Sequence, residues 1–156
     1  INSGSDCGWL DKVEFTSGPP LGEAVDNTAL SWTTGGNADW FRQTATYYYG
    51  GDAAQSGRIT HNQYTYIRTT VTGAGTLTYY WKVYSQSGYD FLRFYIDGVE
   101  RARISGFVGW QLRSYSINSG AHTLEWRYTK NSSISIGNDC GWLDKVGFIP
   151  APSPIR

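Results

Sequence analysis

The sequence contains few titratable side chains in the arrangements that catalysis requires. Of its two histidines, His122 alternates with apolar residues as a buried imidazole would, whereas His61 lies in a polar, turn-like stretch. There is no GxSxG, HExxH or CxxC motif and no phosphate-binding glycine loop. A glycosidase needs an opposed pair of carboxylates, but two of the acids in the central segments, Asp97 and Glu100, lie beside a turn. The sequence therefore predicts a protein that is not an enzyme.

Aromatic and basic side chains point instead to binding. A set of them alternates with apolar residues and is expected to cover the outer face of one sheet: Tyr80, Lys82, Tyr84, Arg93, Tyr95, Arg103, Arg113, Tyr115 and Arg127. Aromatic rings stack on sugar faces and Arg binds carboxylates or sulfates, so this surface suits an acidic polysaccharide. Tyr and Arg also make good cross-strand pairs, and that interpretation stays open. The predicted ligand-binding residues are Trp40, Tyr48, Tyr80, Tyr84, Arg93, Tyr95, Arg113 and Tyr115.

The segments that must position these residues are short and alternating. They are expected at about 64–72, 77–85, 91–96, 100–104, 110–117, 122–130 and 142–148, separated by Gly-containing turns. Asp97-Gly98 is a strong signal for a two-residue hairpin. No segment reads as a helix. The core faces are expected to be the apolar sets, including Trp81 and Trp126. Many strands at this spacing predict an all-β, two-sheet antiparallel β-sandwich of the jelly-roll kind.

An internal repeat divides the chain. DCGWLDKV occurs at residues 6–13 and again at residues 139–146, and Gly4 and Phe15 match Gly137 and Phe148. The repeat predicts that residues 1–16 are the closing strand of a preceding copy, residues 17–20 a linker, residues 21–149 the module, and residues 150–156 a proline-rich tail outside any sheet. The repeated cysteines, Cys7 and Cys140, are a candidate disulfide pair or two buried thiols.

Composition limits the partners. The chain has 156 residues, of which 16% are aromatic, and its formal net charge is zero. Residues 58–130 hold nine Lys and Arg against four acids, which is too sparse for a nucleic-acid surface. The chain begins at Ile1 and contains no apolar run long enough to cross a bilayer. We therefore expect a processed or excised part of a secreted or cell-surface protein that does not insert into a membrane.

The sequence as a whole resembles a known kind of module. The segments GEAVDN, LSWTTGGNADWFRQT, DAAQSG, YYWKVYS, YDFLRFYIDGV, HTLEWRYTK and DCGWLDKV are similar to a bacterial extracellular module that recurs in large surface and secreted proteins. The closing motif resembles that of MAM-type and concanavalin-like jelly rolls. This resemblance covers residues 21–148 and implies attachment or spacing. It also implies a structural Ca²⁺ held by Asp144 together with Glu23 or Asp26, although Asp144 could instead cap a turn or form an ion pair.

Two functions remain as alternatives. The first is a carbohydrate-binding or adhesive module that recognises a polysaccharide through a sheet face or a loop edge that includes Trp40 and Tyr47–Tyr49. The second is a structural repeat whose partners are neighbouring copies, assembled as a homo-oligomer by exchange of the DCGWLDKV strand.

Overall fold

The computed structural model describes residues 21–132 and 139–152. Within these ranges the chain forms one helical turn, α1 (Leu21–Ala24), and eight strands. The strands are β1 (Trp32–Gly36), β2 (Phe41–Gln43), β3 (Ala53–Gln55), β4 (Tyr64–Tyr84), β5 (Phe91–Ile96), β6 (Val99–Ile104), β7 (Phe107–Thr129) and β8 (Cys140–Pro150). Their pairings are all antiparallel, which confirms the all-β prediction. No helix in these ranges is long and apolar enough to cross a membrane.

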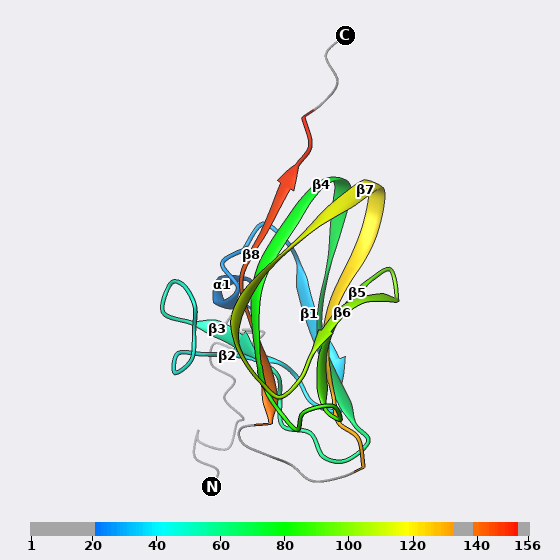
Figure 1. Ribbon diagram of the computed structural model, residues 1–156. Helices are drawn as coiled ribbons and strands as arrows, with labels where there is room; N and C mark the ends of the chain where they lie inside the picture. The colour runs from blue at the N-terminus through cyan, green and yellow to red at the C-terminus, as the bar shows by residue number, and fades with distance from the viewer. Residues whose placement is uncertain (1–20, 133–138, 153–156) are drawn as a thin grey trace, which may run out of the picture.

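Strands β4 and β7 take part in both layers of the sandwich. They pair from Tyr64 opposite Thr129 to Tyr84 opposite Phe107, and this long ribbon arches over near Gly73 and Gly120 (Figure 1). The bend needs glycine, because a Cβ at Gly73 would lie 1.8 Å from the carbonyl oxygen of Asn118. Layer A contains β2, β3, β8 and residues 75–84 and 107–117 of the ribbon. Layer B contains β1, β5, β6 and residues 64–72 and 121–129.

The core lies between the two layers and is rich in aromatic rings. Tyr79 of layer A packs against Phe94 and Trp126 of layer B, with ring centroids 5.0 and 5.2 Å apart. The inward side chains of β4 and β5 are fully or nearly fully buried, as the alternation predicts: Tyr79, Trp81, Val83, Leu92, Phe94 and Ile96. The predicted core faces of these two strands are therefore confirmed.

Several predicted boundaries differ from the structure. The turns expected near Gly73–Gly75 and Ser119–Gly120 do not end the strands, because pairing resumes directly across the bend. The short strands β1, β2 and β3 and the turn α1 were not predicted, since they are too short to show a period. The Asp97-Gly98 hairpin is confirmed, with φ of 51° and 80°. Pro150 ends β8 rather than lying outside it, because only β4 pairs with that end and the missing N–H is not needed.

Candidate functional site

The eight residues predicted to bind a ligand do not share one surface. Tyr80 and Tyr84 lie on the outer face of layer A, where Tyr48 joins them from the loop between β2 and β3. Arg93 and Tyr95 lie on the outer face of layer B. Arg113 and Tyr115 stand opposite Tyr79 and Leu77, so they belong to the inner face of layer A. The prediction of a single sheet face is therefore wrong, because the β4–β7 ribbon crosses from one layer to the other.

Trp40 also differs from the prediction of a surface residue. Its side chain is buried in the core cluster and only 3% exposed, and its backbone N–H donates to the hydroxyl of Thr34. The neighbouring tyrosines Tyr47, Tyr48 and Tyr49 are exposed, as expected for a loop. Trp40 is therefore a core residue next to this loop and not a surface residue that contacts a ligand.

The basic residues on the outer face of layer B are paired within the sheet. Glu125, only 6% exposed, accepts hydrogen bonds from Arg68 and Arg127. Glu100 forms ion pairs with Arg93 and Arg103. The guanidinium groups also stack on neighbouring rings, including Arg127 over Tyr95 at 4.6 Å. This geometry favours the cross-strand-pair interpretation for layer B, because these cations already have partners.

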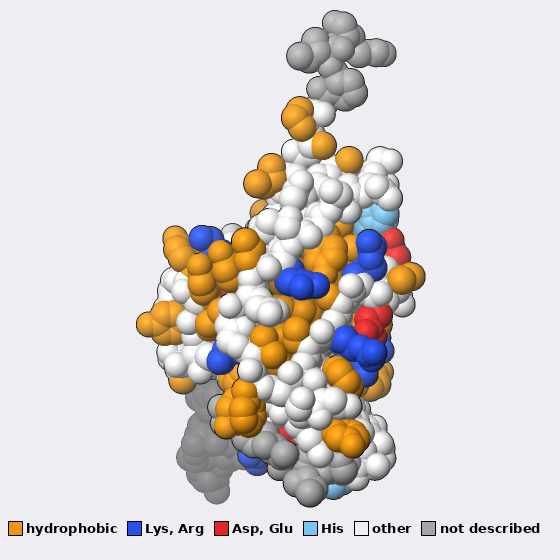
Figure 2. Space-filling view, viewed as in Figure 1, with side chains coloured by type: hydrophobic (Ala, Val, Ile, Leu, Met, Phe, Trp, Pro, Cys, Tyr) orange, Lys and Arg blue, Asp and Glu red, His pale blue; other side chains and the backbone are white. Residues whose placement is uncertain are grey.

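The outer face of layer A carries aromatic side chains in place of the ion pairs seen on layer B. We define the aromatic face as Tyr48, Tyr80, Tyr84, Phe107 and Trp110. The rings of Tyr48 and Tyr80 stack 3.7 Å apart with Trp110 beside them, 6.3 Å from Tyr48. Tyr84 and Phe107 stack 4.1 Å apart at the other end. Hydrophobic side chains gather over the β2–β3 loop on this side of the molecule (Figure 2). Sequence reasoning missed Phe107 and Trp110, although Tyr84, the partner of Phe107 across the ribbon, was recognised.

Asp144 of the repeated motif holds the loop between β2 and β3 against the sheet. We call this loop, which carries Tyr47, Tyr48 and Tyr49, the tyrosine loop. The Asp144 side chain is completely buried, and Oδ2 accepts the backbone N–H groups of Tyr48 and Tyr49 at 2.7 and 2.9 Å. Lys145, the next residue, lies with Nζ 4.4 Å from the centre of the Tyr49 ring. The closing motif therefore positions part of the aromatic face.

The predicted metal ligands are brought together only in part. Asp26 and Asp144 form a carboxyl pair at the loop. Burial and the hydrogen bond to Asp144 raise the pKa of Asp26 to about 7. Burial also raises the pKa of Asp144, although the N–H groups of Tyr49 and Tyr48 oppose the shift. Glu23 is exposed in α1, and no contact is found in the described chain between its carboxylate and this pair.

The chemistry of this carboxyl pair fits Ca²⁺, because the pair brings two hard oxygen donors together. In residues 21–132 and 139–152, however, no three His, Cys, Asp or Glu side chains come together as a metal site. Backbone carbonyls or water would have to complete the coordination shell.

The other residues of the repeated motif are structural. Trp142 is buried beneath Lys82, and its Nε1–H donates to Gln55 Oε1 at 2.9 Å. Cys140 carries a free, buried thiol, and burial raises its pKa to about 12. Its predicted partner Cys7 lies outside the described residues, as do Trp9 and the rest of the first copy, so the disulfide stays a prediction.

A small cavity of about 280 Å³ opens between the β5–β6 hairpin and the bend of β7. Its lining includes Asp97, Arg101, Asn118 and His122. The imidazole of His122 is not buried as predicted, because β7 bends at this point and the core ends. Its Nδ1 lies 2.6 Å from Asp97 Oδ2 and its Nε2 lies 3.1 Å from the Ser119 carbonyl oxygen. The hydrogen bond to Asp97 raises the pKa of His122, and both ring nitrogens are engaged.

Solved structures share this fold at low sequence identity. The galactotriose-bound structure of TmCBM61 aligns with a TM-score of 0.55 at 13% identity, over 88% of this chain and 98% of that one. The K3 adhesin domain of Lys-gingipain from Porphyromonas gingivalis aligns with a TM-score of 0.56 at 12% identity, over 77% and 91%. The secreted serine protease VesC from Vibrio cholerae aligns with a TM-score of 0.57 at 12% identity, over 72% of this chain and only 24% of the protease.

These similarities support a β-sandwich of the kind found in carbohydrate-binding modules and bacterial adhesin domains, whereas the narrower MAM-like assignment stays a prediction. No curated protein sequence matches the chain. A family model described as "Uncharacterized protein E02H4.4 C-terminal domain" matches residues 28–139, which is most of the chain. The chain therefore belongs to the family of E02H4.4 C-terminal domains.

Proposed function

We propose that this chain is a non-catalytic module of a secreted or cell-surface protein, and that it binds an extended polysaccharide across the aromatic face of layer A. The observation that carries the proposal is the pair of aromatic stacks, Tyr48–Tyr80 and Tyr84–Phe107, exposed at the two ends of one strand face. Tyr80 and Tyr84 are four residues apart on β4, which corresponds to about 13 Å at the usual rise of a strand. A single sugar ring cannot contact both stacks, so the proposed ligand is a chain of sugars.

Two further features support a polysaccharide. Stacking against pyranose rings needs flat side chains held in a fixed orientation, and Asp144 holds the loop that carries Tyr48. Lys82 lies over the Trp142 ring at 5.6 Å and Lys145 over the Tyr49 ring at 4.4 Å. These two lysines suit a neutral or weakly acidic chain. Among the structures that share the fold, TmCBM61 was solved with β-1,4-galactotriose.

Removing a ring from the aromatic face is expected to weaken binding. In gels containing galactan or xylan, the wild-type chain should be retarded, and Tyr48→Ala should reduce the association constant by ~10-fold or more, since stacking of one ring is worth roughly 1.4 kcal/mol or more in a desolvated site. Tyr48→Ala keeps the backbone N–H that Asp144 accepts, so the loop stays anchored. Affinity electrophoresis over a polysaccharide concentration series measures the change.

Tyr95→Ala is the matched control, because Tyr95 lies on the outer face of layer B under Arg127. It should bind as the wild type does. Absence of retardation on every polysaccharide tried, or an equal loss in Tyr95→Ala, would contradict the proposal.

We also propose that Ca²⁺ binds at the Asp26–Asp144 pair and holds the tyrosine loop. Calcium would bridge the two carboxyl groups and so link the turn that follows α1 to β8. Adding Ca²⁺ should raise the melting temperature by ~4 °C or more, which corresponds to about 1 kcal/mol in a domain of this size. Chelation by EDTA should return the melting temperature to its original value. Asp26→Asn should abolish the calcium response, whereas Glu23→Gln should retain it. A Ca²⁺ titration without any thermal shift would rule the site out.

Assembly of neighbouring copies is a second candidate function, and the repeated octapeptide favours it. Residues 140–146 belong to β8, and several of them make specific contacts there. For example, Gly141 exchanges hydrogen bonds with Ser56, and a Cβ on Gly141 would lie 3.0 Å from Leu92. Residues 6–13 have the same sequence and could fill the β8 position of another copy. One difference limits the exchange, because Glu14 is the equivalent of Gly147, where a Cβ would lie 3.0 Å from the Thr78 hydroxyl oxygen.

Strand exchange predicts oligomers that depend on the first copy. Size-exclusion chromatography with light scattering should detect dimers and larger species at high concentration, and deletion of residues 1–16 should leave a monomer. The variant Leu10→Asp is a gentler test, because it alters only the residue equivalent to the buried Leu143. A chain that is monomeric at every concentration would exclude this function.

A further inference from the structure

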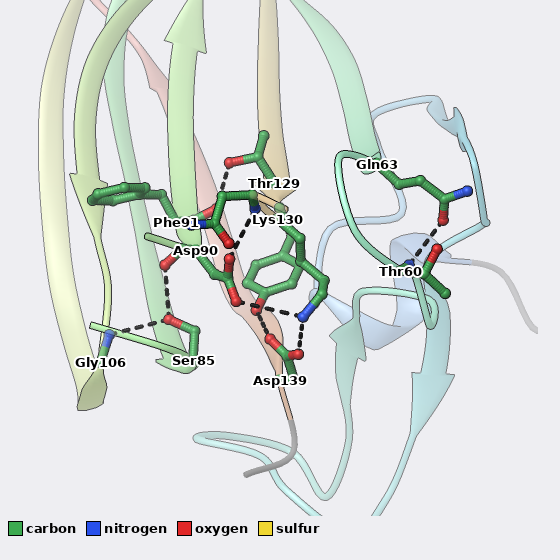
Figure 3. Close-up of polar contacts among 11 residues, drawn as sticks. Thr60, Gln63, Ser85, Asp90, Phe91, Gly106, Thr129, Lys130 and Asp139 are labelled. Atoms are coloured by element: carbon green, nitrogen blue, oxygen red, sulfur yellow. Dashed lines mark hydrogen bonds and ion pairs between the residues drawn. The ribbon is translucent and has the colours of Figure 1, made fainter. Parts of the chain in front are cut away.

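A lysine and two carboxylates lie together inside the protein, where β7 ends and β8 begins. Lys130 and Asp90 have completely buried side chains, and that of Asp139 is 10% exposed. The ammonium nitrogen of Lys130 contacts Asp139 Oδ2 and lies 3.4 Å from Asp90 Oδ2 (Figure 3). Nothing in the proposed polysaccharide site uses this cluster, and each charge is costly to bury.

The two carboxylates differ in their other partners. Asp90 Oδ1 accepts the backbone N–H of Asn131 at 3.0 Å, and its Oδ2 faces Lys130. Asp139 Oδ1 accepts the hydroxyl proton of Tyr128, whose side chain is fully buried. Burial, followed by the hydrogen bond to Asp139, raises the pKa of Tyr128, so its hydroxyl remains a proton donor. One carboxylate is therefore arranged to accept protons, and the other is polarised by a donor.

From this geometry we propose that Lys130 and Asp139 form an intramolecular amide bond. The Nζ–Cγ bond forms when the deprotonated amine of Lys130 attacks the side-chain carbonyl carbon of Asp139. Asp90 accepts two protons from Nζ in turn, one before the attack and one after it, and passes both to the departing oxygen, so that the C–O bond breaks and this oxygen leaves as water. An ammonium and a carboxylate thus become a neutral amide and one water molecule, and no other reactant is needed.

Tyr128 has a role in the same step. Its hydroxyl hydrogen-bonds to Asp139 Oδ1, the oxygen on which negative charge develops when the carbonyl carbon becomes tetrahedral. Holding amine and carboxyl in contact replaces a bimolecular reaction with an intramolecular one, for which effective concentrations of about 10⁵ M or more are known. Burial also keeps bulk water away from the amide that forms. The product replaces the buried charges of Lys130 and Asp139 by a neutral amide, while Asp90 keeps the hydrogen bond from the backbone N–H of Asn131.

The bond would tie the end of β7 directly to the beginning of β8. It would fix the position of Asp139, the first residue of the repeated motif. A later residue of the motif, Asp144, binds the tyrosine loop. The equivalent residue in the first copy is Asp6. The pattern that recurs in the sequence therefore includes the reactive carboxyl as well as the core residues of β8.

Mass spectrometry of the denatured full-length chain tests the bond. The wild-type mass is expected to be lower than the sequence mass by one water molecule. Trypsin should not cleave after Lys130, because its amine is blocked, and should release a single peptide of residues 128–145 that is lighter by one water. Cleavage into residues 128–130 and 131–145, with the full sequence mass, would show an ion pair only and would overturn the proposal.

Variants assign the roles. Asp139→Ala and Lys130→Arg should each have their full sequence mass. Asp90→Asn keeps the shape of the proton acceptor but not its charge, and should contain mostly unlinked chain. Asp6→Asn is the matched control, because it changes the equivalent residue of the first copy, and it should still lack one water. If Asp139→Ala also lacked a water molecule at residues 128–145, the missing water would come from another residue and the proposal would fail.

Discussion

Replacing Trp126 with alanine is expected to lower the free energy of unfolding by about 3–5 kcal/mol. Trp126 is completely buried on β7, and its ring packs against Phe94, Tyr79 and Trp32 at centroid distances of 5.0, 5.2 and 5.9 Å. These rings come from both layers, so the truncation opens a cavity at the centre of the sandwich. Equilibrium unfolding in urea, followed by tryptophan fluorescence and circular dichroism, measures the loss.

Trp126→Phe is the matched comparison. The Nε1–H of Trp126 is buried and has no hydrogen-bond partner among the described residues, so replacing the indole by a phenyl ring removes an unsatisfied donor. This gain offsets part of the lost packing, and the expected loss is below about 1.5 kcal/mol. A loss in Trp126→Ala no larger than that in Trp126→Phe would mean that the two layers do not pack through this residue.

Replacing Lys130 with methionine is expected to cost about 3–5 kcal/mol, because it leaves two carboxylates buried without a cation. Asp90 and Asp139 would then face each other across the space that the lysine nitrogen occupies. The loss is expected whether Lys130 and Asp139 are joined by an amide or by an ion pair, since the substitution removes both. Urea unfolding at neutral pH measures it.

A double variant isolates the charge effect. Asp139→Asn in the Lys130→Met background removes one of the two uncompensated charges and keeps the hydrogen bond with Tyr128, so it should recover a substantial part of the loss. Lowering the pH should also narrow the difference between Lys130→Met and the wild type, because protonation neutralises the carboxylates. A double variant that is less stable than Lys130→Met would show that charge burial is not the cause.

The distribution of charge explains why a basic surplus produces no basic surface. The excess of Lys and Arg falls on strands of layer B, where Glu100 and Glu125 each bind two arginines. Two acids therefore hold four arginines at short range. Binding on this face would have to break these pairs, whereas the rings of layer A are accessible without breaking any ion pair.

The sequence by itself determined the strand class and the side of β4 and β5 that is buried. Alternation at Tyr79–Val83 and Leu92–Ile96 reflects the two-residue period of a strand, which is a local property and can be read directly. The Asp97-Gly98 hairpin was readable for the same reason, because its positive φ angles depend on the two residues themselves. The repeat of the closing strand was found directly, because residues 6–13 and 139–146 have the same sequence.

Only the tertiary structure decided which of these faces meet. Alternation says that Tyr80 and Arg93 both point outward, but not that the β4–β7 ribbon bends and places them on opposite sides of the molecule. Trp40 is buried because the core reaches under its loop, and His122 is partly exposed because β7 bends there. The meeting of Lys130, Asp90 and Asp139 likewise depends on contacts between residues far apart in sequence. Such contacts are set by packing of the whole chain, which no local pattern records.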